Sequence, residues 1–275
     1  MIIFAKLSAK SQNLDSHTMD RRDFIKKTAV AAAGVAMTTP VAGMLQSASS
    51  QLPTAEGKTQ PTTQIKGKMK VLLINGSPRR DGNTFSALNE IAEQLQKHGV
   101  ESEIFQIGTK PVRSCINCGG CRRNGDNKCV FDDDICNTVS QKLAEADALV
   151  VGSPVYYGQP NGGVLSLMQR VFFSAGSFAQ NKPAAAVAVC RRGGATATFQ
   201  AMNMMFQMMN MPVVTSQYWN IVYGAAKGES KLDTEGMQTM RTLANNMAWL
   251  LEKIHAGGKS VPERESDWKG MNFIR

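Results

Sequence analysis

The sequence predicts an α/β protein built on a doubly wound, five-stranded parallel sheet. Short apolar runs alternate with longer segments of helical periodicity along most of the chain, as in βαβ units. The first apolar run leads through a polar turn into a helix start, and later runs also end in loops rich in Gly, Ser or Pro. Because ligands of such sheets bind beyond the carboxyl ends of the strands, we expect the functional residues in these loops.

The first unit has the sequence VLLINGSPRRDGNT over residues 71–84. Residues 71–74 form a run typical of a strand covered on both faces. Gly and Pro residues then break the strand. Asn83 or Thr84 is the expected cap of the helix that follows.

The later elements repeat this alternation. We expect Asp133 and Asp134 to cap the helix over 137–146. The other expected strands are 103–107, 148–153, 184–190 and one that begins at 213–215, and the other expected helices are 164–173, 195–209 and 234–255.

Residues 1–50 have the layout of an export signal that is removed from the mature protein. Arg21 and Arg22, with Phe24 close behind, precede an uncharged run over 29–45, and small residues follow. The paired arginines resemble the twin-arginine signal, so we expect a periplasmic protein, with Met19 as an alternative start. A membrane anchor is the alternative, but the apolar run is short for a span, and no stable span is expected after cleavage.

Composition separates the remaining segments and limits the partners. Residues 51–67 are rich in Pro, Thr, Gln and Gly and indicate a linker, followed by a folded domain over 68–256 and a tail over 257–275. The chain has 31 Lys and Arg against 22 Asp and Glu, a formal net charge of +9. These charges are scattered rather than clustered beside aromatic residues, which argues against nucleic-acid binding and favours small anions or an acidic partner.

The turn after the first strand predicts an anion site. Backbone N–H groups and the positive end of a helix dipole converge where a strand leads into a helix. Ser77, Asn83 and Thr84 add neutral donors and Arg79 adds charge, while Gly82 is one of the residues that end the strand. The expected ligand is a phosphate monoester. The loop lacks both the Gly-Lys-Ser/Thr of a Walker loop and the Gly-x-Gly-x-x-Gly of dinucleotide sites, and an ordinary strand-to-helix turn is the alternative.

Three loops together resemble those of the flavodoxin-like NAD(P)H-dependent FMN reductases. They are GSPR with GNT in 76–84, SPVYYG in 153–158 and RRGGA in 191–195. The resemblance covers about 68–255 and implies a flavodoxin-like fold, FMN as cofactor and NAD(P)H as candidate co-substrate. It places the phosphate of FMN in the first loop and its ring against the other two, although the tyrosines of the second loop could instead pack in the core. The implied FMN-binding residues of these two loops are Pro154, Val155, Tyr156, Tyr157, Gly158, Arg192, Gly193 and Gly194.

A cysteine-rich loop over 111–136 is the second strong feature. Cys115, Cys118 and Cys121 recur every third residue and Cys129 follows, a spacing closer to iron–sulfur sites than to zinc sites. It resembles the motif of the iron–sulfur flavoproteins, which implies these four residues as ligands of a [4Fe–4S] cluster beside FMN. Disulfides or free thiols are the alternatives, above all in an oxidising compartment. The two other cysteines are expected in the core: Cys136 and Cys190.

These features predict an exported, FMN-dependent NAD(P)H oxidoreductase. Electrons would pass from NAD(P)H or a redox partner through FMN, and through a cluster if one is bound, to a quinone or another acceptor. No side chain is expected to act as acid or base, because the flavin carries the reaction. The alternatives are a non-enzymatic electron carrier and a disulfide-bonded binding module without flavin. A second apolar stripe on the Met-rich helix, formed by Met204, Met208 and Met211, predicts a homo-oligomer.

Overall fold

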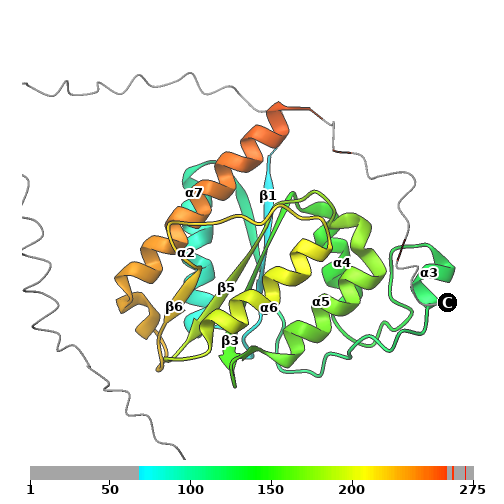
Figure 1. The fold of residues 1–275 in the computed structure, drawn as a ribbon, viewed down its shortest axis with the longest axis horizontal. Helices are drawn as coiled ribbons and strands as arrows, with labels where there is room; N and C mark the ends of the chain where they lie inside the picture. Colours follow the sequence, from blue (N-terminus) through cyan, green and yellow to red (C-terminus); the bar gives the residue numbers. More distant parts are fainter. Residues whose placement is uncertain (1–67, 259–261, 263–269, 271–275) are drawn as a thin grey trace, which may run out of the picture. The chain divides into compact units, whose positions relative to one another are not determined.

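In the computed structural model, residues 68–258, together with Pro262 and Gly270, are described. The expected export signal, the linker and most of the tail lie outside the described residues. The described part is a central sheet with helices on both faces (Figure 1). It is therefore the doubly wound arrangement that the alternation of the sequence predicts.

The sheet has the strand order β2-β1-β3-β5-β6. All neighbours along this path are parallel, and counting only these strands gives the flavodoxin-like order 2-1-3-4-5. A short strand, β4 (Gln159–Pro160), pairs antiparallel with the end of β3 and brings the sheet to six strands. The parallel strands are β1 (Lys70–Asn75), β2 (Glu101–Gln106), β3 (Ala148–Tyr156), β5 (Ala184–Cys190) and β6 (Ile221–Tyr223).

The last parallel strand is not where the sequence predicts it. Val213 makes only an isolated bridge to Ala184. The chain then turns away through residues 215–220, where Ser216 donates to the carbonyl of Tyr218, and rejoins the sheet at β6. The expectation of a strand beginning at 213–215 was wrong because β-branched residues there favour extended backbone but find only one pairing position.

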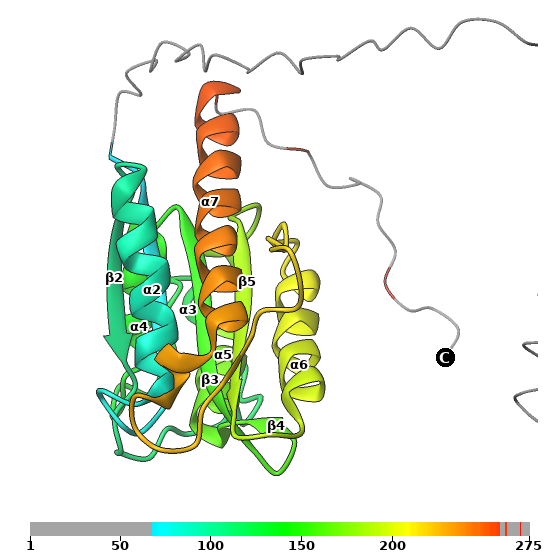
Figure 2. The ribbon, with the colours of Figure 1, turned by 90° about the vertical axis from the view of Figure 1, so that its left-hand side faces the viewer.

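The helices bury two separate apolar faces of the sheet. Alternate residues of β1 point to opposite sides, Val71 and Leu73 to one, Leu72 and Ile74 to the other. The first side is covered by α2 (Asn83–Lys97) and α7 (Thr234–Ala256), which Figure 2 shows in front of the sheet. The opposite side is covered by α4 (Cys136–Glu145), α5 (Gly162–Ala175) and α6 (Ala195–Met208). Three short helices complete the fold: α3 (Gly120–Asn124), η1 (Gly176–Phe178) and η2 (Glu229–Leu232).

At two predicted helix starts the N-cap position is occupied by a residue other than the predicted ones. Gly82 is the N-cap of α2, one residue before Asn83, and no side chain caps this helix. Ile135 is the N-cap of α4, also without a side-chain cap. Asp133 and Asp134 form ion pairs with arginines, and Asp134 Oδ1 also accepts from the amide of Cys136, the first residue of α4 (3.0 Å), so Asp134 does contribute to this helix start.

Two further expectations concern membrane spans and the exposed face of α6. Over residues 68–258, none of the helices combines the length and the apolar character that a bilayer crossing needs.

On α6, Met202 is buried against the sheet, whereas the side chains of Met204 and Met208 are 58% and 81% exposed. The third residue predicted on this stripe, Met211, follows the end of α6 and is buried, so the exposed stripe consists of Met204 and Met208.

Candidate functional site

The loop after β1 is held in shape by buried polar residues. Asn75 accepts a hydrogen bond from the Ser77 amide (3.1 Å) and donates to Gln106, whose side chain donates to the Ser77 carbonyl. Gly76 is required here, because a Cβ would lie 2.1 Å from a methyl of Val164. Sequence analysis missed Asn75 and Gln106, although both are polar residues at the ends of adjacent predicted strands, which is the available signal.

The start of α2 lies open beside this loop. Its N-cap is Gly82 and no side chain caps it, so the first amides of the helix are available to a ligand. Ser77 and Thr84 are buried next to it, and Arg79 is exposed. The Ser77 hydroxyl accepts from the Arg79 amide (3.1 Å). An uncapped helix start with hydroxyl donors and a cation fits a phosphate group.

The side chain of Asn83 has a different role from the one predicted. Its Nδ2 donates to the carbonyl of Ala226 (2.9 Å), and its Oδ1 accepts from the amides of Gly228 (3.0 Å) and Ser230 (3.2 Å). Asn83 thus tethers the segment 224–230 to the start of α2. Both polar atoms of its side chain are therefore engaged with this segment.

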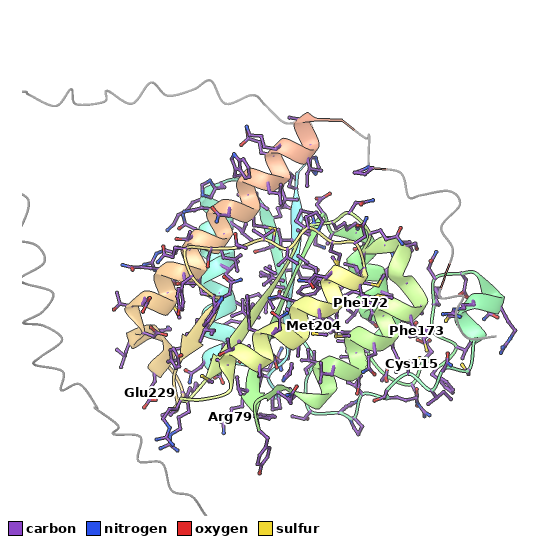
Figure 3. All side chains as sticks on the ribbon, viewed as in Figure 1. Arg79, Cys115, Phe172, Phe173, Met204 and Glu229 are labelled. Atoms are coloured by element: carbon purple, nitrogen blue, oxygen red, sulfur yellow. The ribbon has the colours of Figure 1, made fainter. Side chains whose placement is uncertain are left out.

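The tethered segment has its own internal support. Glu229 accepts from the amides of Ala226 (2.8 Å) and Ala225 (2.7 Å), and these two bonds lower the pKa of its carboxyl. Lys227 forms an ion pair with Asp81 of the first loop. Figure 3 shows Arg79 and Glu229 at the same end of the molecule. The segment is therefore part of this edge of the sheet, and nothing in its local sequence indicated so.

The second loop is a tight hairpin. Tyr156 pairs with Gln159, and the two residues between them, Tyr157 (φ 51°) and Gly158 (φ 76°), both have positive φ. Two successive residues with positive φ are the mark of a type I′ turn, which commonly closes two-residue hairpins. Tyr156 is 46% exposed and Tyr157 is fully exposed, so the alternative that they pack in the core is wrong. Both rings are free to cover a ligand at this edge.

The third loop touches the second. Gly194 has φ 86°, and a Cβ there would lie 2.7 Å from the Cα of Gly158 and 3.1 Å from a methyl of Val155. Arg192 and Gly193 are exposed beside it. Gly194 is also the N-cap of α6, which again has no side-chain cap. The three predicted loops thus meet at the carboxyl edge of adjacent strands.

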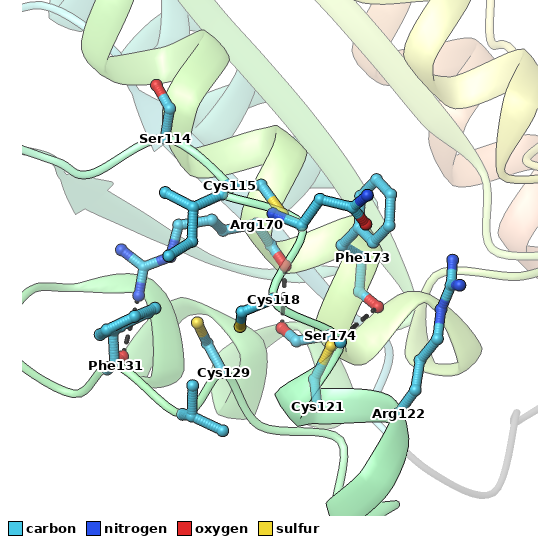
Figure 4. Close-up of a pocket in the computed structure, with 14 residues that line it drawn as sticks. Ser114, Cys115, Cys118, Cys121, Arg122, Cys129, Phe131, Arg170, Phe173 and Ser174 are labelled. Carbon is cyan, nitrogen blue, oxygen red and sulfur yellow. Dashed lines mark hydrogen bonds between the residues drawn. The ribbon is translucent and has the colours of Figure 1, made fainter.

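The four predicted metal ligands line a single pocket. Figure 4 shows Cys115, Cys118, Cys121 and Cys129 around it, with Arg170 of α5 at one side. Cys118 is exposed, and the others are partly exposed. All six cysteines of the chain are free thiols in this structure, so it shows none of the disulfides that were the alternative.

The pocket is shaped by turns that need small or polar residues. Asn117, Gly119 and Gly125 have φ values of 52°, 69° and 67°. Asn137 accepts from the amide of Cys129 (2.8 Å) and donates to its carbonyl (3.0 Å). The backbone around the cysteines is therefore defined from both sides of the loop.

The thiols suit a cluster by chemistry but are not gathered as a chelating group. Within the described residues, no three His, Cys, Asp or Glu side chains are arranged to hold a metal ion. Soft thiolates are the ligands that iron–sulfur clusters use, and all four line the same cavity. The donor set therefore fits a cluster, and binding one requires the sulfurs to draw together.

Arg170 lines this pocket, whereas the two remaining cysteines lie outside it in the core. Cys136 and Cys190 are buried, as expected, and burial raises the pKa of the Cys136 thiol to about 12. Burial opposes the charge of Arg170, but a hydrogen bond with the Cys129 thiol and the charge of Asp134 are among the causes that raise its pKa overall. Sequence analysis assigned no role to Arg170 or to its ion pair with Asp134.

Comparison with known proteins agrees with this geometry. Residues 69–226 match the NADPH-dependent FMN reductase family. An iron–sulfur flavoprotein of Methanocaldococcus jannaschii is 34% identical over 194 residues, which cover 68% of this chain and 99% of the relative. One of Methanosarcina thermophila is 32% identical over 192 residues, 68% of this chain and 97% of the relative.

Among solved structures, RosB with bound 8-demethyl-8-formylriboflavin-5′-phosphate is similar with a TM-score of 0.50. The identity is 15%, over 75% of this chain and 95% of that chain, which shows a shared fold. The strand order, the three converging loops and the family match lead to one conclusion: the chain belongs to the NADPH-dependent FMN reductase family, with iron–sulfur flavoproteins among its relatives.

Proposed function

We propose that the protein is an exported oxidoreductase that binds FMN and passes electrons from NAD(P)H or a redox partner to a quinone or another acceptor. One observation carries the proposal. The uncapped start of α2, with Ser77, Thr84 and Arg79, lies at the same sheet edge as the touching second and third loops. A phosphate cradle beside two exposed loops is what a flavin nucleotide requires.

Different residues would bind the phosphate and the ring of FMN. The amides at the start of α2 and the hydroxyls of Ser77 and Thr84 would hold the phosphate, with Arg79 adding charge. The hairpin tyrosines, Tyr156 and Tyr157, would cover the ring. Bound FMN supplies hydride and single-electron chemistry, and the protein supplies position and shields the ring from water.

We also propose that the four cysteines bind a [4Fe–4S] cluster. Support comes from four thiols that line one cavity and from relatives that are named iron–sulfur flavoproteins. A cluster would let single electrons leave a flavin that accepts them in pairs. Iron and sulfide analysis of protein purified without oxygen tests this part.

A non-enzymatic electron carrier is the second candidate function. The rim of the cysteine pocket carries exposed apolar side chains, Ile116, Val130 and Phe173, which suits contact with another protein. If pure protein with bound FMN oxidises no NADPH and no NADH in the presence of a quinone, this candidate replaces the enzyme.

The proposed export and self-association have separate tests. Export rests on the twin-arginine pattern in 1–50; cell fractionation and N-terminal sequencing of the recovered protein should show a periplasmic chain that lacks this segment. Self-association rests on the exposed Met204 and Met208 of α6, and sedimentation of the wild type against a variant with both residues changed to Gln tests it.

The decisive experiment is titration of the purified apoprotein with FMN. We expect saturable binding, quenched flavin fluorescence and reduction of the bound flavin by NADPH or by a chemical donor. An apoprotein that is folded by circular dichroism but does not bind FMN would overturn the proposed function, whatever the cysteines hold.

A further inference from the structure

Arg170 is a buried cation in the wall of the cysteine pocket. It lies on α5, and its side chain is 1% exposed. Burying a guanidinium is unfavourable unless its charge and its donors are compensated. Its charge is compensated by Asp134, whose side chain is also buried.

The guanidinium joins the two ends of the cysteine loop. One end is Arg113, which lies two residues before the first cysteine. The carbonyl of Arg113 accepts a hydrogen bond from Nη1 of Arg170 (3.4 Å). The other end follows the last cysteine: the carbonyl of Phe131 accepts from Nη2 (2.8 Å), and the carboxylate of Asp134 accepts from Nη1. Figure 4 shows the guanidinium reaching from α5 to Phe131. Arg170 therefore closes the neck of the loop that carries all four thiols.

Other residues of the cysteine loop form hydrogen bonds with the same face of α5. Ser114 hydrogen-bonds to the hydroxyl of Ser166 (2.8 Å), and the thiol of Cys121 donates to the carbonyl of Phe173 (3.7 Å). Residues 166, 170 and 173 are spaced so that they lie on one side of a helix. Because α5 begins directly after the hairpin of the second loop, it links the flavin edge to the thiols.

One donor of Arg170 is left over. Its Nε–H is buried and has no hydrogen-bond partner within the described part of the chain. Leaving a buried donor unpaired costs about 1–3 kcal/mol, and more when the group is charged. The acceptors that line this pocket include the sulfur atoms of its cysteines, beside the hydroxyls of Ser114 and Ser174.

We propose that Arg170 is the positioning residue of the cysteine site: it clasps the neck of the loop and donates its free Nε–H to a sulfur ligand when a cluster is bound. This inference rests on the proposed cluster. The clasp brings the thiols together, and the N–H···S bond favours the more negative, reduced form of the cluster. Loss of the clasp or of the N–H···S bond should make the cluster release iron faster, and loss of the N–H···S bond should lower the reduction potential of the cluster.

The test compares variants of the full chain, reconstituted with ferrous iron and sulfide without oxygen. Arg170→Lys keeps the charge but removes the fork and the Nε. The double variant Arg170→Gln with Asp134→Asn removes both charges together, so that no buried charge is left unpaired. Arg122→Lys is the matched control, because Arg122 lines the same pocket but stacks on Phe173 rather than joining the neck.

Three quantities are measured: iron lost to a chelator over time, the cluster's reduction potential, and FMN bound per chain. In both Arg170 variants we expect iron loss to be faster by about tenfold or more, as for other residues that support metal ligands. We also expect a lower potential and unchanged FMN binding. Arg122→Lys should match the wild type in all three.

Each outcome decides. A cluster in the wild type with equal iron loss and potential in the Arg170 variants would overturn this inference and leave the proposed function intact. A wild type that takes up no iron would overturn the cluster proposal and this inference together, while FMN binding would still stand. FMN content and thermal unfolding show whether each variant is folded. If Arg170→Lys does not fold, the comparison of the double variant with the wild type tests the inference.

Discussion

The backbone of Gly194 lies against Gly158, so closely that a Cβ at Gly194 would stand 2.7 Å from the Cα of Gly158. Gly194 also has φ 86°, a backbone conformation that residues other than glycine adopt only at an energetic cost. This contact fixes the hairpin of the second loop against the third, at the edge where the flavin ring is proposed to lie.

We expect Gly194→Ala to weaken FMN binding by about tenfold or more, because the hairpin must move away, and to destabilise the fold by about 1–2 kcal/mol. FMN titration and chemical unfolding measure the two effects. Gly162→Ala is the control: Gly162 is the first residue of α5, is not among the implied FMN-binding residues and has nothing within 4 Å of its added Cβ, so FMN affinity should change by no more than about twofold. Equal affinities of the two variants would show that the contact does not matter for binding.

The tether from Asn83 makes a second prediction. Asn83→Ala removes three hydrogen bonds to the segment 224–230, each worth about 1 kcal/mol net, so we expect a loss of about 1–3 kcal/mol in the free energy of unfolding. Limited proteolysis should cut the variant within this segment sooner than the wild type. Asn89→Ala, which removes an exposed bond to Glu93 on the same helix, serves as the control. If both variants are cut at the wild-type rate, the tether is not what orders the segment.

The sequence was sufficient to predict the sheet and the three loops, because each apolar run ends visibly at Gly, Ser or Pro. It was insufficient for the last strand. Val213 and its neighbours have strand propensity, while the true strand, Ile221–Tyr223, is three residues long and too short for a pattern. Pairing partners, not local preference, decide such a strand.

Contacts between distant segments account for what was missed at the site. Asn83 binds residues 143–147 positions away, so no local pattern could predict its tether. Arg170 is different, because it lies one turn after Leu167 on the apolar face of α5. A cation at a core position of a helix is a signal that sequence analysis could have used.

Arg79 should distinguish FMN from riboflavin. A charged hydrogen bond to phosphate is worth about 1.5–3 kcal/mol, so we expect Arg79→Ala to weaken FMN binding by about tenfold or more and to leave riboflavin binding unchanged. Lys97→Ala is the control, because it removes the same charge at the opposite end of α2 and should affect neither ligand. Competition between the two flavins, followed by fluorescence, measures the ratio. An equal loss for both ligands would mean that Arg79 contacts the ring or shapes the loop.

Glu103 predicts how stability depends on pH. Its carboxylate on β2 pairs with Lys142 of α4 and with Lys70 of β1 (3.1 Å), and the hydrogen bond from Lys142 is the main cause that lowers its pKa. Because the folded pKa lies below the unfolded one, the stabilisation is complete above the unfolded value of about 4.3 and disappears as the pH falls through the folded value. Glu103 is one-third exposed, so the effect is modest.

We therefore expect Glu103→Gln to be less stable than the wild type by about 1 kcal/mol or less at pH 7, and the two to converge in acid. Urea unfolding between neutral and acid pH measures the difference. Glu252→Gln is the control, because Glu252 is exposed and its ion-pair partner among the described residues is its neighbour Lys253 on the same helix, at 3.6 Å. A difference between Glu103→Gln and the wild type that stays constant into acid would mean that packing at this position, not the charge of the carboxylate, stabilises the contact between β2 and α4.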